Sequence, residues 1–148
     1  DETFDVGLLR CVAGEEVGVV PCSHLLQARR TLGGVPAVDD DLGTLGEEGI
    51  RVDVVDLRTV RPMDVEAITA SVRKTNRAVV LEEGWEIAGI GAQVVDYIQR
   101  DCFDHLDAPV IRVHQADVPM PYAKQLEKSA KPDVAKTIAA VKKVMYVD

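Results

Sequence analysis

The sequence predicts an α/β fold in three layers, with a mostly parallel sheet and helices on both faces. From residue 50 onward, short valine-rich segments alternate with longer segments whose apolar residues recur every three or four positions. Parallel neighbours need a connection long enough for a helix, and the intervening segments are long enough. At 148 residues the chain fits one domain, which buries about 70% of the surface exposed by its unfolded form.

Three strands are expected in this part of the chain. They lie at residues 51–57, 77–81 and 109–113, which are short and rich in valine and isoleucine. Right-handed crossovers through the helices would pair them in parallel.

Three amphipathic helices are expected beside these strands. The first starts at Pro62 and Asp64 and carries basic residues in its last turn, as the helix dipole favours. The second covers residues 90–106. The third starts at Pro132 and Asp133 and reaches Met145.

The first 49 residues predict one further strand and helix. Residues 16–20 have the composition of a strand, and residues 23–32 form a helix that Ser23 would cap and Gly33 would end. A loop and a short helical piece ending at Gly49 follow. We therefore expect residues 1–45 to form a divergent segment, one strand-helix unit of the same domain, and residues 46–148 to form the main body of the domain.

Composition narrows the classes of function. The net charge of −8, spread along the chain, repels a phosphate backbone, so nucleic acid is not expected as a partner. No apolar run reaches the roughly 20 residues of a membrane span, and no membrane partner is expected. The three cysteines have no C-x-x-C spacing, which favours a reducing compartment. No secretory signal is visible.

Motifs for catalysis or cofactor binding are weak. Gly89 and Gly91 supply two glycines of a dinucleotide fingerprint, but Val94 stands where the third should be, so tight packing is the stronger interpretation. No phosphate-binding P-loop motif occurs, and the three histidines lie far apart. Glu82 and Glu83 follow a strand, where they could take part in chemistry or contact a helix or another subunit.

A proline-rich loop follows the third strand. Pro119 and Pro121 each fix φ and remove a hydrogen-bond donor, so the residues around Met120, ending in Tyr122, must project in a preset shape. Pro119, Met120, Pro121 and Tyr122 are candidate partner-binding residues. An ordinary surface connection is the equally weighted alternative.

An acidic cluster lies near the end of the second predicted helix. Asp101, Asp104 and Asp107 gather where the dipole is already negative and favours basic residues. A basic partner would offset the cost, which is a few tenths of a kcal/mol for each exposed acid. A solvated acidic surface is the alternative interpretation.

Six segments together carry a family resemblance. They are Val55-Asp-Leu-Arg-Thr-Val-Arg-Pro-Met-Asp64, Lys74-Thr-Asn-Arg77, Glu82-Glu-Gly-Trp85, Gly89-Ile-Gly-Ala92, Leu106-Asp-Ala-Pro109 and Ala116-Asp-Val-Pro-Met-Pro-Tyr-Ala-Lys124. Residues 50–145 resemble the C-terminal domain of the beta-type subunit of thiamine-diphosphate-dependent 2-oxoacid dehydrogenases, and most closely that of pyruvate dehydrogenase. The resemblance implies a fold similar to the transketolase C-terminal domain. Residues 1–45 depart from the family pattern.

The resemblance implies an assembly and docking role in oxidative decarboxylation and acetyl transfer to lipoyl-lysine. The partners it implies are the alpha-type subunit, a second beta subunit and the basic subunit-binding domain of the dihydrolipoyl acyltransferase. The family's docking aspartate falls on Asp107, beside Asp104, and the family's contact also involves Tyr146 and Asp148. Thiamine diphosphate and magnesium would belong to the full assembly, so no catalytic, cofactor or metal residue is expected here and the isolated chain should be inactive. A cytoplasmic (bacterial) or mitochondrial-matrix location is implied.

Three alternatives stay open from the sequence. The chain could be the equivalent domain of a branched-chain 2-oxoacid or acetoin dehydrogenase. It could be a free-standing small-molecule or nucleotide-binding module that uses the Gly89–Gly91 turn. It could also form a homodimer through the loop from Pro119 to Tyr122.

Overall fold

The computed structural model describes residues 4–11, 50–57 and 59–147. In these ranges four parallel strands form one sheet in the spatial order β2-β1-β3-β4. The strands are β1 (Phe4–Cys11), β2 (Ile50–Leu57), β3 (Ala78–Glu82) and β4 (Ile111–Val113). The α/β class and the parallel sheet predicted from the sequence are confirmed.

The sequence located three of these strands and missed one. The strand predicted at 109–113 begins only at Ile111, since Pro109 has no amide to donate to a sheet. β1, which the sequence did not predict, pairs along its whole length with β2, from Phe4 beside Ile50 to Cys11 beside Leu57. The strand and helix predicted at 16–20 and 23–32 lie outside the described residues. The division at residue 45 stays a prediction.

Helix α2 (Val65–Thr75) and helix α5 (Val134–Met145) begin at aspartates that cap their first amides. Asp64 Oδ1 accepts from the Ala67 amide at 2.9 Å, and Asp133 Oδ1 accepts from the Lys136 amide at 2.7 Å. Both helices begin where the sequence predicts, because each cap satisfies an amide that has no partner within the helix.

Helix α3 (Ile90–Cys102) is shorter than the predicted segment 90–106. Its last turn tightens into the 3₁₀ helix η2 (Phe103–His105), in which the Leu106 amide donates to the Phe103 carbonyl at 3.2 Å. Tightening of this kind is common at helix ends, because it satisfies carbonyls that the α-helix leaves free.

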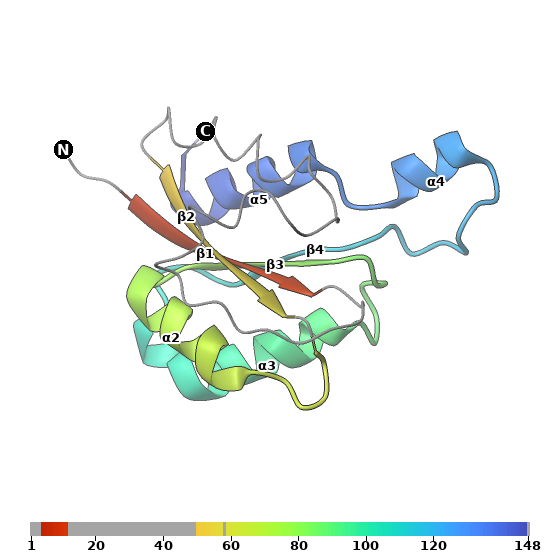
Figure 1. Cartoon of the computed structure of the whole chain (residues 1–148). Coiled ribbons are helices and arrows are strands. Elements are labelled where there is room, and N and C mark those ends of the chain that lie inside the picture. Colours follow the sequence, from red (N-terminus) through yellow and green to blue (C-terminus); the bar gives the residue numbers. More distant parts are fainter. Residues whose placement is uncertain (1–3, 12–49, 58, 148) are drawn as a thin grey trace, which may run out of the picture.

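Helix α4 (Lys124–Ala130) was not predicted. It has seven residues, its N-cap Ala123 offers no capping side chain, and only Ala130 is buried. In Figure 1 it projects from the end of the domain, beyond the sheet. The sequence gives little signal for such a helix, because most of its residues face solvent and no apolar period develops.

Two cores lie on opposite faces of the sheet (Figure 1). Helices α2 and α3 cover one face, where Ile68, Val72, Val94 and Ile98 are fully buried. Helix α5 covers the other face through side chains that include Val141. Strand β3 is buried at all five positions, so it is the centre of the three layers.

Replacing a fully buried isoleucine should reveal how much this packing contributes. We expect Ile98→Ala to lower the free energy of unfolding by about 2–5 kcal/mol, because it removes apolar contacts and leaves a cavity between α3 and the sheet. Urea denaturation measures the change. Ile87→Ala makes the same chemical change at a residue that is 72% exposed, and should cost less than about 0.5 kcal/mol. Equal effects of the two variants would contradict the described core.

Candidate functional site: two protein-contact surfaces

The acidic cluster predicted from the sequence occupies one end of the domain. Asp101 lies in the last turn of α3, Asp104 lies in η2 and Asp107 follows η2, and all three are exposed. Phe103 lies among them with 63% of its surface exposed. We call Asp101, Phe103, Asp104, Asp107 and Tyr146 the acidic end.

Helix α2 fixes this segment in place. Asn76, the C-cap of α2, adopts a left-handed conformation with φ of 61°. Its side-chain amide donates to the His105 carbonyl at 2.7 Å, and its own carbonyl accepts from the Asp107 amide at 2.8 Å. Arg73 adds a hydrogen bond to the Asp101 carbonyl at 3.1 Å. The acidic side chains are therefore carried by a backbone that three hydrogen bonds hold to α2.

The end of α5 reaches the same region. Arg77, next to Asn76, places its Nη1 atom 3.7 Å from Met145 Sδ, and Tyr146 is the exposed C-cap of α5. The structure thus brings Asp104, Asp107 and Tyr146 to one end of the sheet, at the start of β3. Asp148 lies outside the described residues.

The charge at this end is largely uncompensated within the described part of the chain. Asp101, Asp104 and Asp107 form no ion pair with another described side chain. Beneath them, burial raises the pKa of the Cys102 thiol, while Arg73 partly opposes the shift. Cys102 is therefore a neutral thiol buried beneath the acidic residues. The exposed carboxylates are the groups that a partner could contact.

The proline-rich loop lies at the opposite end of the sheet, after β4 (Figure 1). Tyr122 is fully exposed, at 104% of its reference surface, and Met120 is 46% exposed. Val118 and Leu126 add exposed apolar area. We call the segment from Val118 to Leu126 the proline surface; it includes the predicted residues Pro119 and Pro121. The predicted partner-binding residues that the structure describes therefore fall on two separate surfaces.

Glu82, considered for chemistry from the sequence, is instead part of a buried ion pair. Its side chain is 2% exposed, and Oε1 accepts from Arg112 Nη2 at 2.5 Å. The same guanidinium donates to the Glu86 carbonyl at 2.9 Å, so it also orders the loop after β3. Glu83 is exposed and lies 3.6 Å from Lys131. Of the two interpretations the sequence allowed, the structural one fits this geometry.

The glycines near the start of α3 make room for the Glu82 carboxylate. Its Oε2 accepts from the Gly91 amide at 2.9 Å. A Cβ at Gly91 would overlap Glu82 Oε1, and a Cβ at Gly89 would overlap the Trp85 carbonyl. A helix N-terminus can bind phosphate through its free amides, but here an internal carboxylate occupies that position. The geometry therefore disfavours a dinucleotide at this turn.

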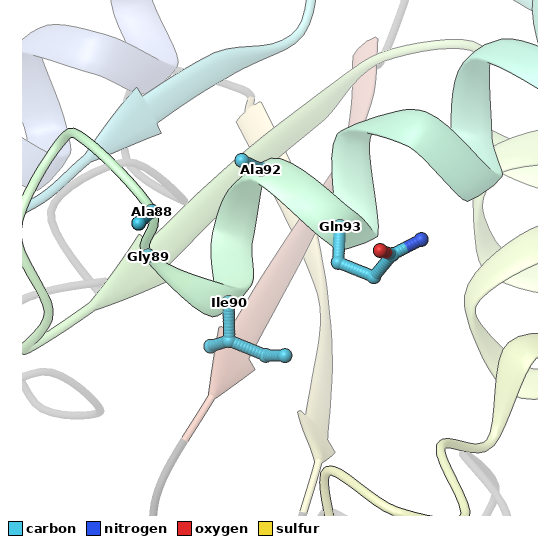
Figure 2. A pocket seen from close by; sticks show the side chains of 5 residues that line it. All are labelled: Ala88, Gly89, Ile90, Ala92 and Gln93. Atoms are coloured by element: carbon cyan, nitrogen blue, oxygen red, sulfur yellow. The ribbon is translucent and has the colours of Figure 1, made fainter.

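A pocket open to solvent lies beside this turn, and Figure 2 shows the five residues that line it. Its lining residues are small or uncharged: Ala88, Gly89, Ile90, Ala92 and Gln93. Within the described residues no group of three or more His, Cys, Asp or Glu side chains is placed to hold a metal ion. No helix in the described ranges has the length and apolarity needed to cross a membrane.

Arg112 is the important residue that sequence reasoning missed. It lies in β4 between two apolar residues and 30 positions from Glu82, so no local pattern joins the pair. A charged residue inside a short apolar strand is itself a signal, because a buried charge needs a partner. Gly84, Gly89 and Gly91, which follow Glu82, were a second signal, because together they leave room for the buried Glu82 carboxylate.

Comparison with known proteins identifies the family. The family model described as "Transketolase, C-terminal domain" matches residues 42–137. This chain belongs to the transketolase C-terminal domain family. The pyruvate dehydrogenase E1 component subunit beta of Rickettsia bellii is 49% identical over 108 residues, which are 73% of this chain and 33% of that protein. The mitochondrial subunit beta of Mus musculus is 52% identical over 104 residues, 70% of this chain and 29% of that protein.

This transketolase C-terminal domain therefore spans about a third of the length of the curated relatives it matches. A solved structure, "Split gene transketolase, inactive beta4 tetramer", superposes with a TM-score of 0.67 at 23% identity. The match covers 99% of this chain and 40% of the other. At this identity the likeness shows the fold alone, and it agrees with the family assignment.

Removing Arg112, the counter-ion of Glu82, should destabilise the folded chain. We expect Arg112→Leu to lower the free energy of unfolding by about 3–5 kcal/mol, because it leaves a buried carboxylate without its counter-ion. Urea denaturation measures the loss, and the fluorescence of Trp85, the single tryptophan, reports the change in its loop. Arg100→Leu removes a mainly exposed ion pair with Asp96 and should cost below about 1 kcal/mol. Similar losses in both variants would argue against the buried pair.

Replacing Asn76 should lower the stability of the chain for two reasons, which two different variants separate. We expect Asn76→Ala to destabilise the chain by roughly 1–3 kcal/mol, since alanine is strained in the left-handed region and the bond to His105 is lost. Asn76→Gly keeps the backbone conformation and should lose only about 0.5–1.5 kcal/mol. Thermal unfolding of both variants provides the test; an alanine variant as stable as the glycine variant would contradict the cap.

Proposed function

We propose that this chain is the assembly and docking domain of a pyruvate dehydrogenase beta subunit. In the multienzyme complex it contributes to oxidative decarboxylation of pyruvate and to acetyl transfer to lipoyl-lysine. The isolated chain is inactive in this proposal. Bacterial cytoplasm or the mitochondrial matrix is the proposed location. Relatives named as E1 component subunit beta, at about half identity, support the proposal.

The observation that carries the docking role is the fixed acidic end. Asp104 and Asp107 project from a backbone that α2 holds in place, and neither forms an ion pair with a described side chain. Carboxylates on a preorganised backbone lose little conformational entropy on binding, and exposed Phe103 supplies apolar contact beside them. Tyr146 is exposed at the same end of the sheet. This chemistry suits a basic partner, and we propose the subunit-binding domain of the dihydrolipoyl acyltransferase.

The proline surface is proposed to contact the other subunits of the dehydrogenase. Pro119, Met120, Pro121 and Tyr122 would lie against the alpha-type subunit or a second beta subunit. Proline stiffens the loop, so its apolar side chains are presented with little loss of chain entropy.

Thiamine diphosphate and magnesium are proposed to be held by other parts of the assembly. The one helix start at which the sequence suggested a phosphate, the Gly89–Gly91 turn, is filled by the Glu82 carboxylate. A diphosphate does not fit there, and no catalytic step is assigned to residues of this chain.

Charge removal at the acidic end tests the docking role. We expect Asp107→Asn, in the protein assembled with its partner subunits, to weaken binding of the subunit-binding domain at least about tenfold, because a desolvated charge pair is lost. Titration calorimetry measures the affinity. Binding should also weaken as salt is raised.

Asp117→Asn is the matched control, because it removes an exposed carboxylate at the other end of the sheet. Its affinity for the subunit-binding domain should stay within about twofold of the unchanged protein. If Asp107→Asn and Asp104→Asn together leave the affinity unchanged, the docking assignment is wrong.

A further inference from the structure

Helix α4 and the loop before it are joined to the rest of the domain mainly at one end. The Ala116 amide donates to the Ala130 carbonyl at 2.8 Å, and Lys131 lies 3.6 Å from Glu83. Both contacts lie at the C-terminal end of α4. The other helical residues remain exposed or half-buried, and only Ala130 is buried.

The sequence of α4 alone contributes little to the stability of this helix. Isolated helices shorter than about 12–15 residues are marginal in water, and α4 has seven residues without a side-chain N-cap. Its first intrahelical hydrogen bond runs from the Glu127 amide to the Ala123 carbonyl at 2.9 Å, and the N-cap offers no side chain to the amides before Glu127. Stabilisation of such a helix comes from packing, and the described part of the chain supplies packing only at Ala130.

The exposed side of this segment combines apolar and basic groups. Val118, Met120, Tyr122 and Leu126 are each more than 40% exposed within nine residues of chain. Lys124 and Lys128 form no ion pair with a described side chain, whereas Glu127 is neutralised by Lys131 at 3.1 Å. Asp117, at the start of the segment, is the remaining acid. The helix therefore presents two available cations next to an apolar strip, in a chain whose net charge is −8.

We propose that α4 is completed by the alpha-type subunit, through a contact surface that is an apolar hollow bordered by carboxylates; a second copy meeting this chain through the same face would set lysine against lysine. Tyr122 and Leu126 enter the hollow, and Lys124 and Lys128 meet the carboxylates. Tyrosine is well suited to this role, because it buries a large apolar area and loses little side-chain entropy. The inference rests on the proposed assembly role and adds the chemistry of the partner and the dependence of α4 on it.

Two measurements on the full chain test the inference, alone and assembled with its partner subunits. Hydrogen exchange at the Glu127 and Lys131 amides should slow at least tenfold on assembly. Tyr122→Ala with Leu126→Ala, and separately Lys124→Glu with Lys128→Glu, should each weaken subunit association at least tenfold in sedimentation velocity. Lys143→Glu, the same charge reversal at the exposed C-terminal end of α5, should leave association within twofold.

The outcomes separate this inference from the docking proposal. Variants of α4 should leave the affinity of each assembled unit for the acyltransferase domain unchanged, whereas Asp107→Asn should affect only that affinity. Unchanged association in both α4 variants would overturn the inference. Association of this chain with itself through α4, or binding of the wild-type chain to anionic vesicles that the lysine reversal abolishes, would replace the proposed partner and also overturn it.

Discussion

The buried ion pair between Glu82 and Arg112 is the interaction on which the site geometry depends. It joins the end of β3 to β4, and the second carboxylate oxygen satisfies the Gly91 amide at the start of α3. A pair of this kind contributes less to stability than its short distance suggests, because both charges were desolvated. Its effect is positional: one guanidinium also binds the Glu86 carbonyl and so fixes the loop that carries Trp85.

The two proposed contact surfaces differ in how firmly the fold holds them. At the acidic end, Asn76 and Arg73 bind the backbone of the segment directly, so its carboxylates start from a nearly fixed geometry. At the proline surface, rigidity comes from Pro119 and Pro121, and the helix that follows is attached mainly through Ala130 and Lys131. A preorganised surface favours selective binding, whereas a loosely attached helix couples its own ordering to assembly.

Most of the fold could be predicted from the sequence because its signals are local. Asp64 and Asp133 mark helix starts, and valine-rich segments mark β2, β3 and β4. Strand β1 was missed because Asp5 and Gly7 interrupt its apolar residues, and the strand was assigned to residues 16–20 instead. Helix α4 has no cap and little apolar period. The Glu82–Arg112 pair could not be predicted, since 30 residues separate its members and only the folded sheet brings them together.

For the site, the sequence indicated which residues were unusual but not how they group. The acids near Asp107 stood out against the helix dipole, and the prolines near Met120 stood out by their stiffness. Tyr146 lies at the same end of the sheet as the acids and Tyr122 lies at the other, because α5 packs back along the sheet. The contact of Arg77 with Met145 belongs to this long-range packing, which no local pattern shows.

The placement of the two surfaces at opposite ends of parallel strands has a thermodynamic consequence. Five residues of β3 separate them, roughly 16 Å of extended chain, and they have no side chain in common. Two ligands that bind such a rigid spacer without changing its conformation have a coupling free energy near zero. Occupancy at one end would therefore leave the affinity at the other unaltered, and the domain would act as a passive bridge that holds two proteins at a set separation.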